Sequence, residues 1–194
     1  MATQPNIIDF LWQLDALKAV ERRSYIQGGA RLENSAEHSW HLAMACWAFA
    51  EHLQDDFDLL KLLQLALVHD IGEIGAGDTF LYDSARREAH AQERNYIATL
   101  AEHPGCTLPL LTTWDEQEHG RSKEAQLLKV LDRLLPFLLN MQSGGQAWID
   151  NGVKRSQVKA AHAFVAEDYP EIYAWFSKNV EQAVAQGWLI DDSV

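Results

Sequence analysis

Apolar residues recur every three or four positions along most of this chain, as they do on one face of a helix. Near the N-terminus, Ile7, Leu11 and Leu14 follow this spacing. No run of alternating apolar and polar residues is bounded by hairpin turns, so strands are not expected. The pattern predicts an all-α bundle of about six to eight helices. These helices are expected at residues 6–20, 35–53, 59–71, 84–102, 108–118, 123–142, 153–167 and 170–186.

The chain has 194 residues, which is a usual length for one domain. It contains no stretch with the composition of a linker, no internal repeat and no low-complexity segment. We therefore expect a single domain over residues 1–194, with a core at about 7–142 and C-terminal helices at about 153–187.

Net charge limits the classes of partner. Sixteen Lys and Arg residues stand against 28 Asp and Glu residues, which gives a formal charge of -12. Such an acidic chain repels phosphate over most of its surface, so binding to nucleic acid regardless of sequence is not expected. A small phosphorylated ligand remains a possible partner where a few positive groups converge.

Membrane insertion and secretion are not expected either. No apolar run approaches the roughly 20 residues that a membrane helix needs. The N-terminus lacks a basic segment, and Asp9 and Asp15 interrupt the apolar stretch that follows it. These features predict a cytoplasmic protein that does not contact membranes.

Three polar intrusions into apolar helical segments are candidates for chemistry. His38 lies in the first turn of an apolar helix, and the adjacent pair His69-Asp70 ends another one. Asp132 interrupts a leucine stripe on a third helix. Each has an ordinary interpretation, namely a packed histidine, a helix cap or a surface ion pair. The cap is a poor explanation for Asp70, because a carboxylate is disfavoured at the negative end of a helix dipole.

Taken together, His38, His69, Asp70 and Asp132 supply two imidazoles and two carboxylates. This donor set suits one divalent transition ion with two octahedral positions left for water or substrate. The two carboxylates also balance the charge of the ion, which makes burial tolerable. A bound ion acidifies water, and nearby carboxylates that do not bind the ion can then act as general acid or base. Glu73 and Asp78 are the available candidates.

The ordered set of residues resembles the HD-domain superfamily of metal-dependent phosphohydrolases. That pattern is a His, a His-Asp pair and a distant Asp, each on its own helix. The flanking segments Glu33–Ser39 and His69–Asp78 resemble the branch that contains the bacterial 5′-deoxynucleotidases. The resemblance covers about residues 7–140 and implies a single HD domain that binds one divalent ion, which could be Mn, Co, Fe, Ni, Zn or Mg.

The resemblance also implies roles for residues that do not bind the ion. Glu73 corresponds to the residue that activates the attacking water, and Asp78 to an aspartate involved in catalysis or sugar recognition. An arginine upstream of the first histidine contacts the phosphate in that branch. Arg23 stands at the same offset here, with Arg22 beside it. The implied substrate is a (deoxy)nucleoside 5′-monophosphate.

Other functions remain open from the residues alone. The segments Arg23–Tyr25 and Thr79–Asp83 depart from the Arg-Trp and proline-rich segments of the nucleotidases, so another small phosphoester is an alternative substrate. Oxidation of a non-phosphate substrate would need a second iron, for which His41 is the nearest spare ligand. The ion could also be purely structural, in a helical module that only binds a partner.

Tryptophan positions bear on packing and assembly. We expect Trp12, Trp40 and Trp47 to pack between helices, and the C-terminal tryptophans Trp148 and Trp175 to contribute to a subunit interface with Trp188. A homodimer is implied only by the family resemblance.

Overall fold

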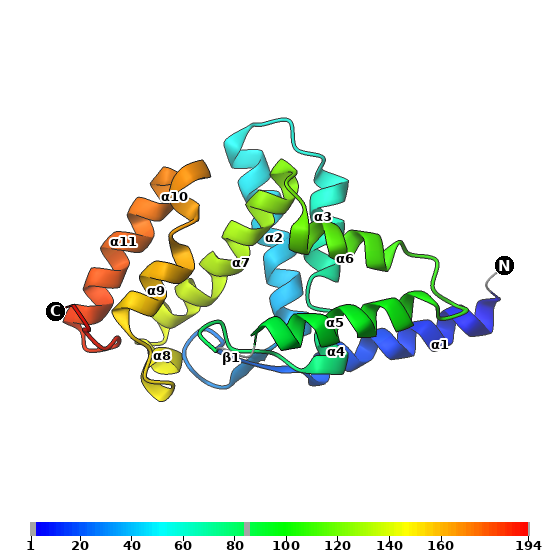
Figure 1. Ribbon diagram of the computed structural model, residues 1–194, viewed down its shortest axis with the longest axis horizontal. Helices are drawn as coiled ribbons and strands as arrows, with labels where there is room; N and C mark the ends of the chain where they lie inside the picture. The colour runs from blue at the N-terminus through cyan, green and yellow to red at the C-terminus, as the bar shows by residue number, and fades with distance from the viewer. Residues whose placement is uncertain (1–2, 84–85, 194) are drawn as a thin grey trace. The chain divides into compact units, whose positions relative to one another are not determined.

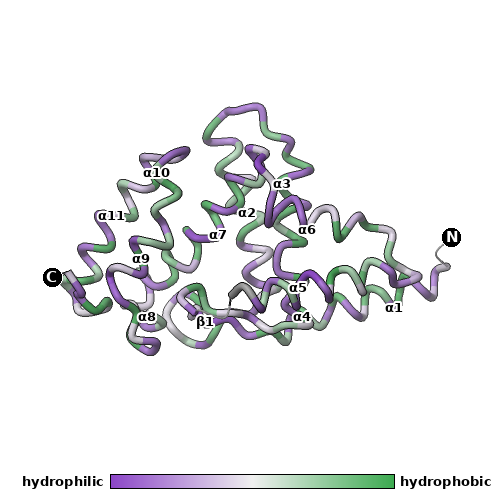
Figure 2. Tube along the Cα trace, viewed as in Figure 1, coloured by the Kyte–Doolittle hydropathy of each residue, from purple (hydrophilic) through white to green (hydrophobic). Residues whose placement is uncertain are grey.

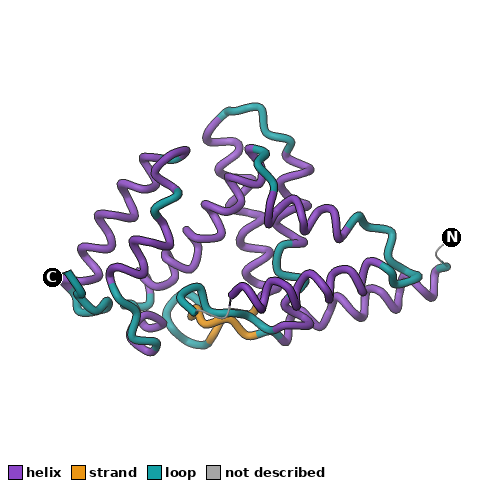
Figure 3. Tube along the Cα trace, viewed as in Figure 1, coloured by secondary structure: helices purple, strands orange, loops and turns teal. Residues whose placement is uncertain are grey.

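The computed structural model describes residues 3–83 and 86–193, which form two compact units. Helices dominate both units (Figure 3), and this confirms the all-α class. That all residues belong to one domain stays a prediction. The first unit contains residues 3–22, 33–79 and 86–132, and the second contains residues 23–32, 80–83 and 133–193.

The first unit is built around one apolar cluster to which most of its helices contribute. Helix α2 packs on α3, and α5 packs on both α4 and α6 (Figure 1). The cluster consists of Phe10, Leu17, Val68, Ile71, Ile97, Leu100, Leu110 and Trp114. The elements of this unit are α1 (Gln4–Asp15), the 3₁₀ helix η1 (Ala16–Ala19), α2 (Ser35–Leu53), α3 (Leu59–Val68), α4 (Glu73–Ala76), α5 (Arg86–Ala101), α6 (Leu110–His119) and the first half of α7 (Lys123–Gln142).

The second unit has an aromatic core centred on Phe137. Its ring lies 4.9 Å from that of Phe176, 5.1 Å from that of Trp148 and 5.5 Å from that of His162, measured between centroids. Edge-to-face contacts of this kind stabilise a core beyond simple burial. The helices of this unit are the second half of α7, α8 (Gln146–Asp150), α9 (Arg155–His162), α10 (Val165–Asp168) and α11 (Pro170–Ala185).

The hydrophobic pattern locates the long helices well. Hydrophobic and hydrophilic positions alternate along the helices (Figure 2), and the predicted bounds of α2 and α7 match the observed ones. The helix expected at 153–167 is divided into α9 and α10, and the start of the one expected at 84–102 lies outside the described residues. The described residues form more helices than predicted, because one-turn helices such as α4, α8 and α10 are too short to show a period.

The expectation that strands are absent is wrong. Strands β1 (Glu21–Tyr25) and β2 (Leu32–Asn34) pair as a small two-stranded sheet, drawn in orange in Figure 3. Their least exposed residues include Arg22, Ser24 and Glu33, which are polar. An apolar alternation is therefore missing, because the strands bury polar groups instead of apolar ones.

The tryptophan expectations are also partly wrong. Trp12 and Trp40 are 71% and 66% exposed, and Trp47 is exposed as well, whereas Trp148 is buried in the core of the second unit. Helical spacing shows which residues share a face, but it does not show whether another element covers that face.

Two glycines let α4 approach α5 closely. A Cβ atom at Gly72 would lie 2.7 Å from the Cβ of Glu93, and one at Gly75 would lie 2.5 Å from the ring of Tyr96. Helix α4 begins at Glu73, so this close approach sets the position of that carboxylate.

We expect Gly72→Ala to destabilise the fold by about 1–3 kcal/mol, because the added methyl group overpacks the contact with α5. Gly75→Ala should act in the same direction. Urea unfolding measures both changes, and a wild-type unfolding midpoint in either variant would contradict the account.

Candidate metal centre

The first turn of α2 carries two buried side chains of the site, Ser35 and His38. A capping box starts this helix, in which the Asn34 side chain accepts from the Glu37 backbone N–H and the Glu37 side chain accepts from the Asn34 backbone N–H. Ser35 therefore does not cap the helix. Its hydroxyl instead donates to Oε2 of Glu73 at 2.5 Å.

The end of α3 supplies the second imidazole. His69 follows the last residue of the helix, and its Nδ1 lies 2.8 Å from the carbonyl oxygen of Ala66. This contact assigns the ring proton to Nδ1 and leaves the lone pair on Nε2. His69 Nε2 is buried, and it has no hydrogen-bond partner among the described residues.

Helix α7 brings the distant aspartate to the same place. Asp132 Oδ1 lies 3.0 Å from Nε2 of His38 and 3.9 Å from Nε2 of His69. Asp70 Oδ1 lies 3.0 Å from the latter nitrogen. Three of these residues, His38, His69 and Asp70, each offer one ligand atom within 4.8 Å of the others. The four residues singled out in the sequence therefore meet in the first unit.

This arrangement fits a divalent cation. The donor set is imidazole nitrogen and carboxylate oxygen, which borderline ions such as Zn, Fe, Co and Mn accept. Nε2 of His69, which has no hydrogen-bond partner within the described ranges, faces Asp70 and Asp132, so an imidazole nitrogen and two carboxylates converge on one point. A cation held there would satisfy all three groups.

Arg22, and not Arg23, lies among the carboxylates. Its Nη1 is 2.7 Å from Oδ2 of Asp70, 3.8 Å from Oε1 of Glu73 and 3.7 Å from Oδ1 of Asp78. Successive side chains of a strand point to opposite faces, and Arg23, the next residue of β1, is exposed. Arg22 is thus the buried positive partner that Asp70 requires.

Electrostatic interactions shift the pKa values of the neighbouring carboxyl groups of Asp70 and Glu73 in opposite directions. Burial alone would raise the pKa of Asp70, but its interactions with His69 and Arg22 outweigh burial and lower that pKa to about 2. Burial and the charge of Asp70 raise the pKa of Glu73 well above its ordinary value. Asp70 therefore stays ionised, whereas Glu73 holds a proton more readily, which is the division expected between a ligand and a base.

His38 is strongly basic in this environment. Burial and the charge of Arg22 would lower its pKa, but the carboxylates of Asp132 and Glu33 prevail and raise it to about 9. Metal ligands must be deprotonated at nitrogen, so an ion would compete with a proton for His38.

Sequence reasoning missed two residues that contact this site. These are Ser35 and Glu33, neither of which the sequence pattern marks as a site residue. Glu33 lies in β2 with Oε2 3.5 Å from Nε of Arg22 and 3.6 Å from Nδ1 of His38. The available signal was a carboxylate and a hydroxyl within five residues of a candidate metal ligand.

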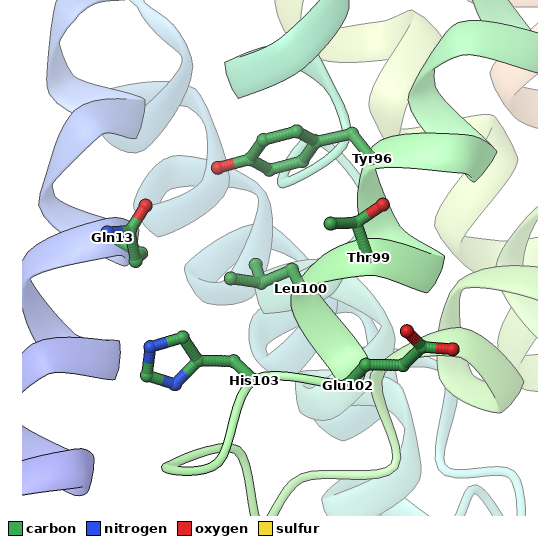
Figure 4. A pocket seen from close by; sticks show the side chains of 6 residues that line it. All are labelled: Gln13, Tyr96, Thr99, Leu100, Glu102 and His103. Carbon is green, nitrogen blue, oxygen red and sulfur yellow. The ribbon is translucent and has the colours of Figure 1, made fainter.

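A separate pocket lies beside α1 and α5 (Figure 4). Its volume is about 200 Å³, and none of the sequence-predicted site residues lines it. Its lining residues are Gln13, Tyr96, Thr99, Leu100, Glu102 and His103. This hollow therefore plays no part in the candidate centre.

The length and hydropathy of the helices also bear on membranes. Among residues 3–83 and 86–193, no helix is both long and apolar enough to span a bilayer.

Comparison with known proteins relates the site to a family. The pattern of the HD domain family matches residues 14–173. The chain is 30% identical over 139 residues to the Dictyostelium discoideum protein named 5′-deoxynucleotidase HDDC2, covering 66% of this chain and 72% of that protein. The Bos taurus protein of the same name is 31% identical over 133 residues, and the match spans 66% of this chain and 63% of the relative.

A solved structure resembles nearly the whole chain. The crystal structure of a protein from Magnetospirillum magnetotacticum, titled as a predicted metal-dependent phosphohydrolase, superposes with a TM-score of 0.84. The two chains are 30% identical, and the match covers 97% of this chain and 99% of that one.

We expect a chelator to lower the thermal unfolding midpoint of the wild-type protein. An ion that binds only the folded chain stabilises it by about 2.7 kcal/mol when its free concentration is 100 times its Kd. His69→Ala should abolish the response to added ion, whereas His119→Ala, which removes an exposed histidine of α6, should keep it. The prediction would be contradicted if neither the chelator nor added ion changed the thermal unfolding midpoint of the wild-type protein.

Proposed function

This chain belongs to the HD domain family and is a phosphohydrolase of that family, and we propose that it releases phosphate from (deoxy)nucleoside 5′-monophosphates. The observation that most supports this proposal is the convergence of His38, His69, Asp70 and Asp132 beside the guanidinium of Arg22. Relatives named 5′-deoxynucleotidase support a nucleotide over other small phosphoesters.

We propose that these two histidines and two aspartates hold one divalent ion. Mn, Co, Fe, Ni, Zn and Mg are the candidates, and the two imidazoles favour a transition ion over Mg. When bound, such an ion supplies a positive centre that acidifies water and offsets the charge of the phosphoryl group.

Glu73 is the proposed proton acceptor for the attacking water. The Ser35 hydroxyl holds Oε2 of this carboxylate, while Oε1 points to Arg22 at 3.8 Å. One oxygen is thus fixed, and the other faces the cluster. The raised pKa of Glu73 makes its ionised form a stronger base than an ordinary carboxylate.

Arg22 and Asp78 are the proposed contacts for the substrate. The Arg22 guanidinium is a preorganised donor for phosphoryl oxygens, and it needs no movement to reach the region of Asp70. Asp78 lies 3.7 Å from the same guanidinium nitrogen. Its carboxylate is placed to orient a sugar hydroxyl or to assist the leaving oxygen.

Two expectations from the sequence stay proposals. We propose a cytoplasmic location and, from the family resemblance, a homodimer.

The central test is Glu73→Gln. Loss of the base should lower kcat by about 100- to 10,000-fold while the metal content stays at the wild-type level. Phosphate release from a panel of nucleoside 5′-monophosphates, together with metal analysis of the same samples, measures both quantities. His69→Ala should lose metal and turnover together. Hydrolysis by Glu73→Gln at the wild-type rate would remove Glu73 from the mechanism.

Arg22 and Arg23 provide a matched pair of variants. Arg22→Lys keeps the charge but loses the planar fork of donors, so KM should rise by about 10- to 100-fold. Arg23→Lys should leave KM unchanged, because that side chain is exposed on the other face of β1. Steady-state kinetics on both variants checks this, and a larger effect at Arg23 would reverse the assignment.

A further inference from the structure

Glu33 is a buried carboxylate that the mechanism above does not use. It is the middle residue of β2 and only 4% exposed. Its Oε2 lies 3.6 Å from Nδ1 of His38 and 3.5 Å from Nε of Arg22. All three atoms are buried, and within the described part of the chain none of them has a hydrogen-bond partner. Glu33 Oε2 is therefore an acceptor beside two nitrogen atoms that have no other partner among the described residues.

The two neighbours of Glu33 belong to different parts of the site. His38 turns its other nitrogen, Nε2, toward Asp132 at 3.0 Å, and Arg22 turns Nη1 toward Asp70 at 2.7 Å. In both residues, Glu33 thus approaches a different nitrogen from the one that faces Asp132 or Asp70.

To bind a cation through Nε2, His38 needs an acceptor beside its Nδ1 atom. An imidazole can bind a cation through Nε2 only when its proton is on Nδ1, and an acceptor beside Nδ1 selects that form and fixes the ring plane. For His69 the acceptor is the backbone carbonyl of Ala66. For His38 the group beside Nδ1 is the side chain of Glu33.

We propose that Glu33 is a positioning residue that orients the His38 imidazole for metal binding and the Arg22 guanidinium for phosphate binding at the same time. This inference rests on the proposed function. One carboxylate then supports both a metal ligand, His38, and a phosphate-binding group, Arg22. A single substitution of Glu33 should therefore weaken both metal and substrate binding.

Glu33→Gln tests the link, because it removes the charge and keeps the shape. We expect its affinity for Co²⁺, measured by competition with a chelator, to fall by about 10- to 100-fold. The visible absorption of the Co²⁺-loaded protein should change, since it reports the geometry around the ion. At saturating Co²⁺, KM for the nucleotide should still be raised, because Arg22 has also lost its support. Glu33→Asp, which retains the carboxylate, should recover part of the metal affinity.

Glu124→Gln is the matched control. Glu124 is also a buried carboxylate of the first unit, but its Oε1 accepts from the backbone N–H of Asp58, at the start of α3. This variant should keep the wild-type Co²⁺ affinity and spectrum.

Several outcomes would overturn the inference. Wild-type Co²⁺ affinity and KM in Glu33→Gln would do so, as would an equal loss of Co²⁺ affinity in Glu124→Gln, which would indicate general destabilisation. If Glu33→Gln does not fold, Glu33→Ala takes its place, and wild-type Co²⁺ affinity and KM in Glu33→Ala overturn the role. If the wild-type protein binds Co²⁺ but releases no phosphate, the proposed function is refuted. The Co²⁺ affinities of Glu33→Gln and the wild type still test the role of Glu33 in that case.

Discussion

The site is organised by the burial of several carboxylates around one guanidinium. Asp70, Glu73, Asp78 and Glu33 all lie within 3.8 Å of a nitrogen of Arg22. Buried like charges repel strongly, and one arginine cannot neutralise four carboxyl groups. The system responds by keeping Asp70 ionised and by raising the pKa of Glu73. A dication beside His69 would remove much of the remaining imbalance, so the same excess of negative charge that strains the fold favours an ion.

Helix ends and a close helix contact hold this charge cluster in place. The capping box at Asn34 starts α2 so that Ser35 and His38 face inward in its first turn. Helix α3 stops at Val68, which leaves Asp70 outside the helix and within reach of Arg22. All of these groups lie on a helix or strand or within two residues of a helix end, so their geometry does not rely on long loops.

The four candidate ligands could be recognised in the sequence because each is a polar or charged residue in an apolar helical segment. A histidine or carboxylate inside an apolar stripe needs a partner, and that need is visible without coordinates. Arg22 and Arg23 could not be separated in this way, because both are arginines in a polar segment with no apolar alternation. The strand that distinguishes them was not predicted, since its buried residues are themselves polar. Glu33 and Ser35 give no clear signal for a related reason, because polar residues at the start of a helix have an ordinary role as caps.

The sequence by itself determined the helical class, the bounds of the longest helices and the identity of the residues that are costly to bury alone. These features follow from local periodicity and from the chemistry of single side chains. Only the tertiary structure decided which arginine enters the site, which serine holds Glu73 and that Trp12 and Trp40 remain exposed. Each of these outcomes depends on which face of an element another element covers. That is a property of packing between distant segments, and no local pattern encodes it.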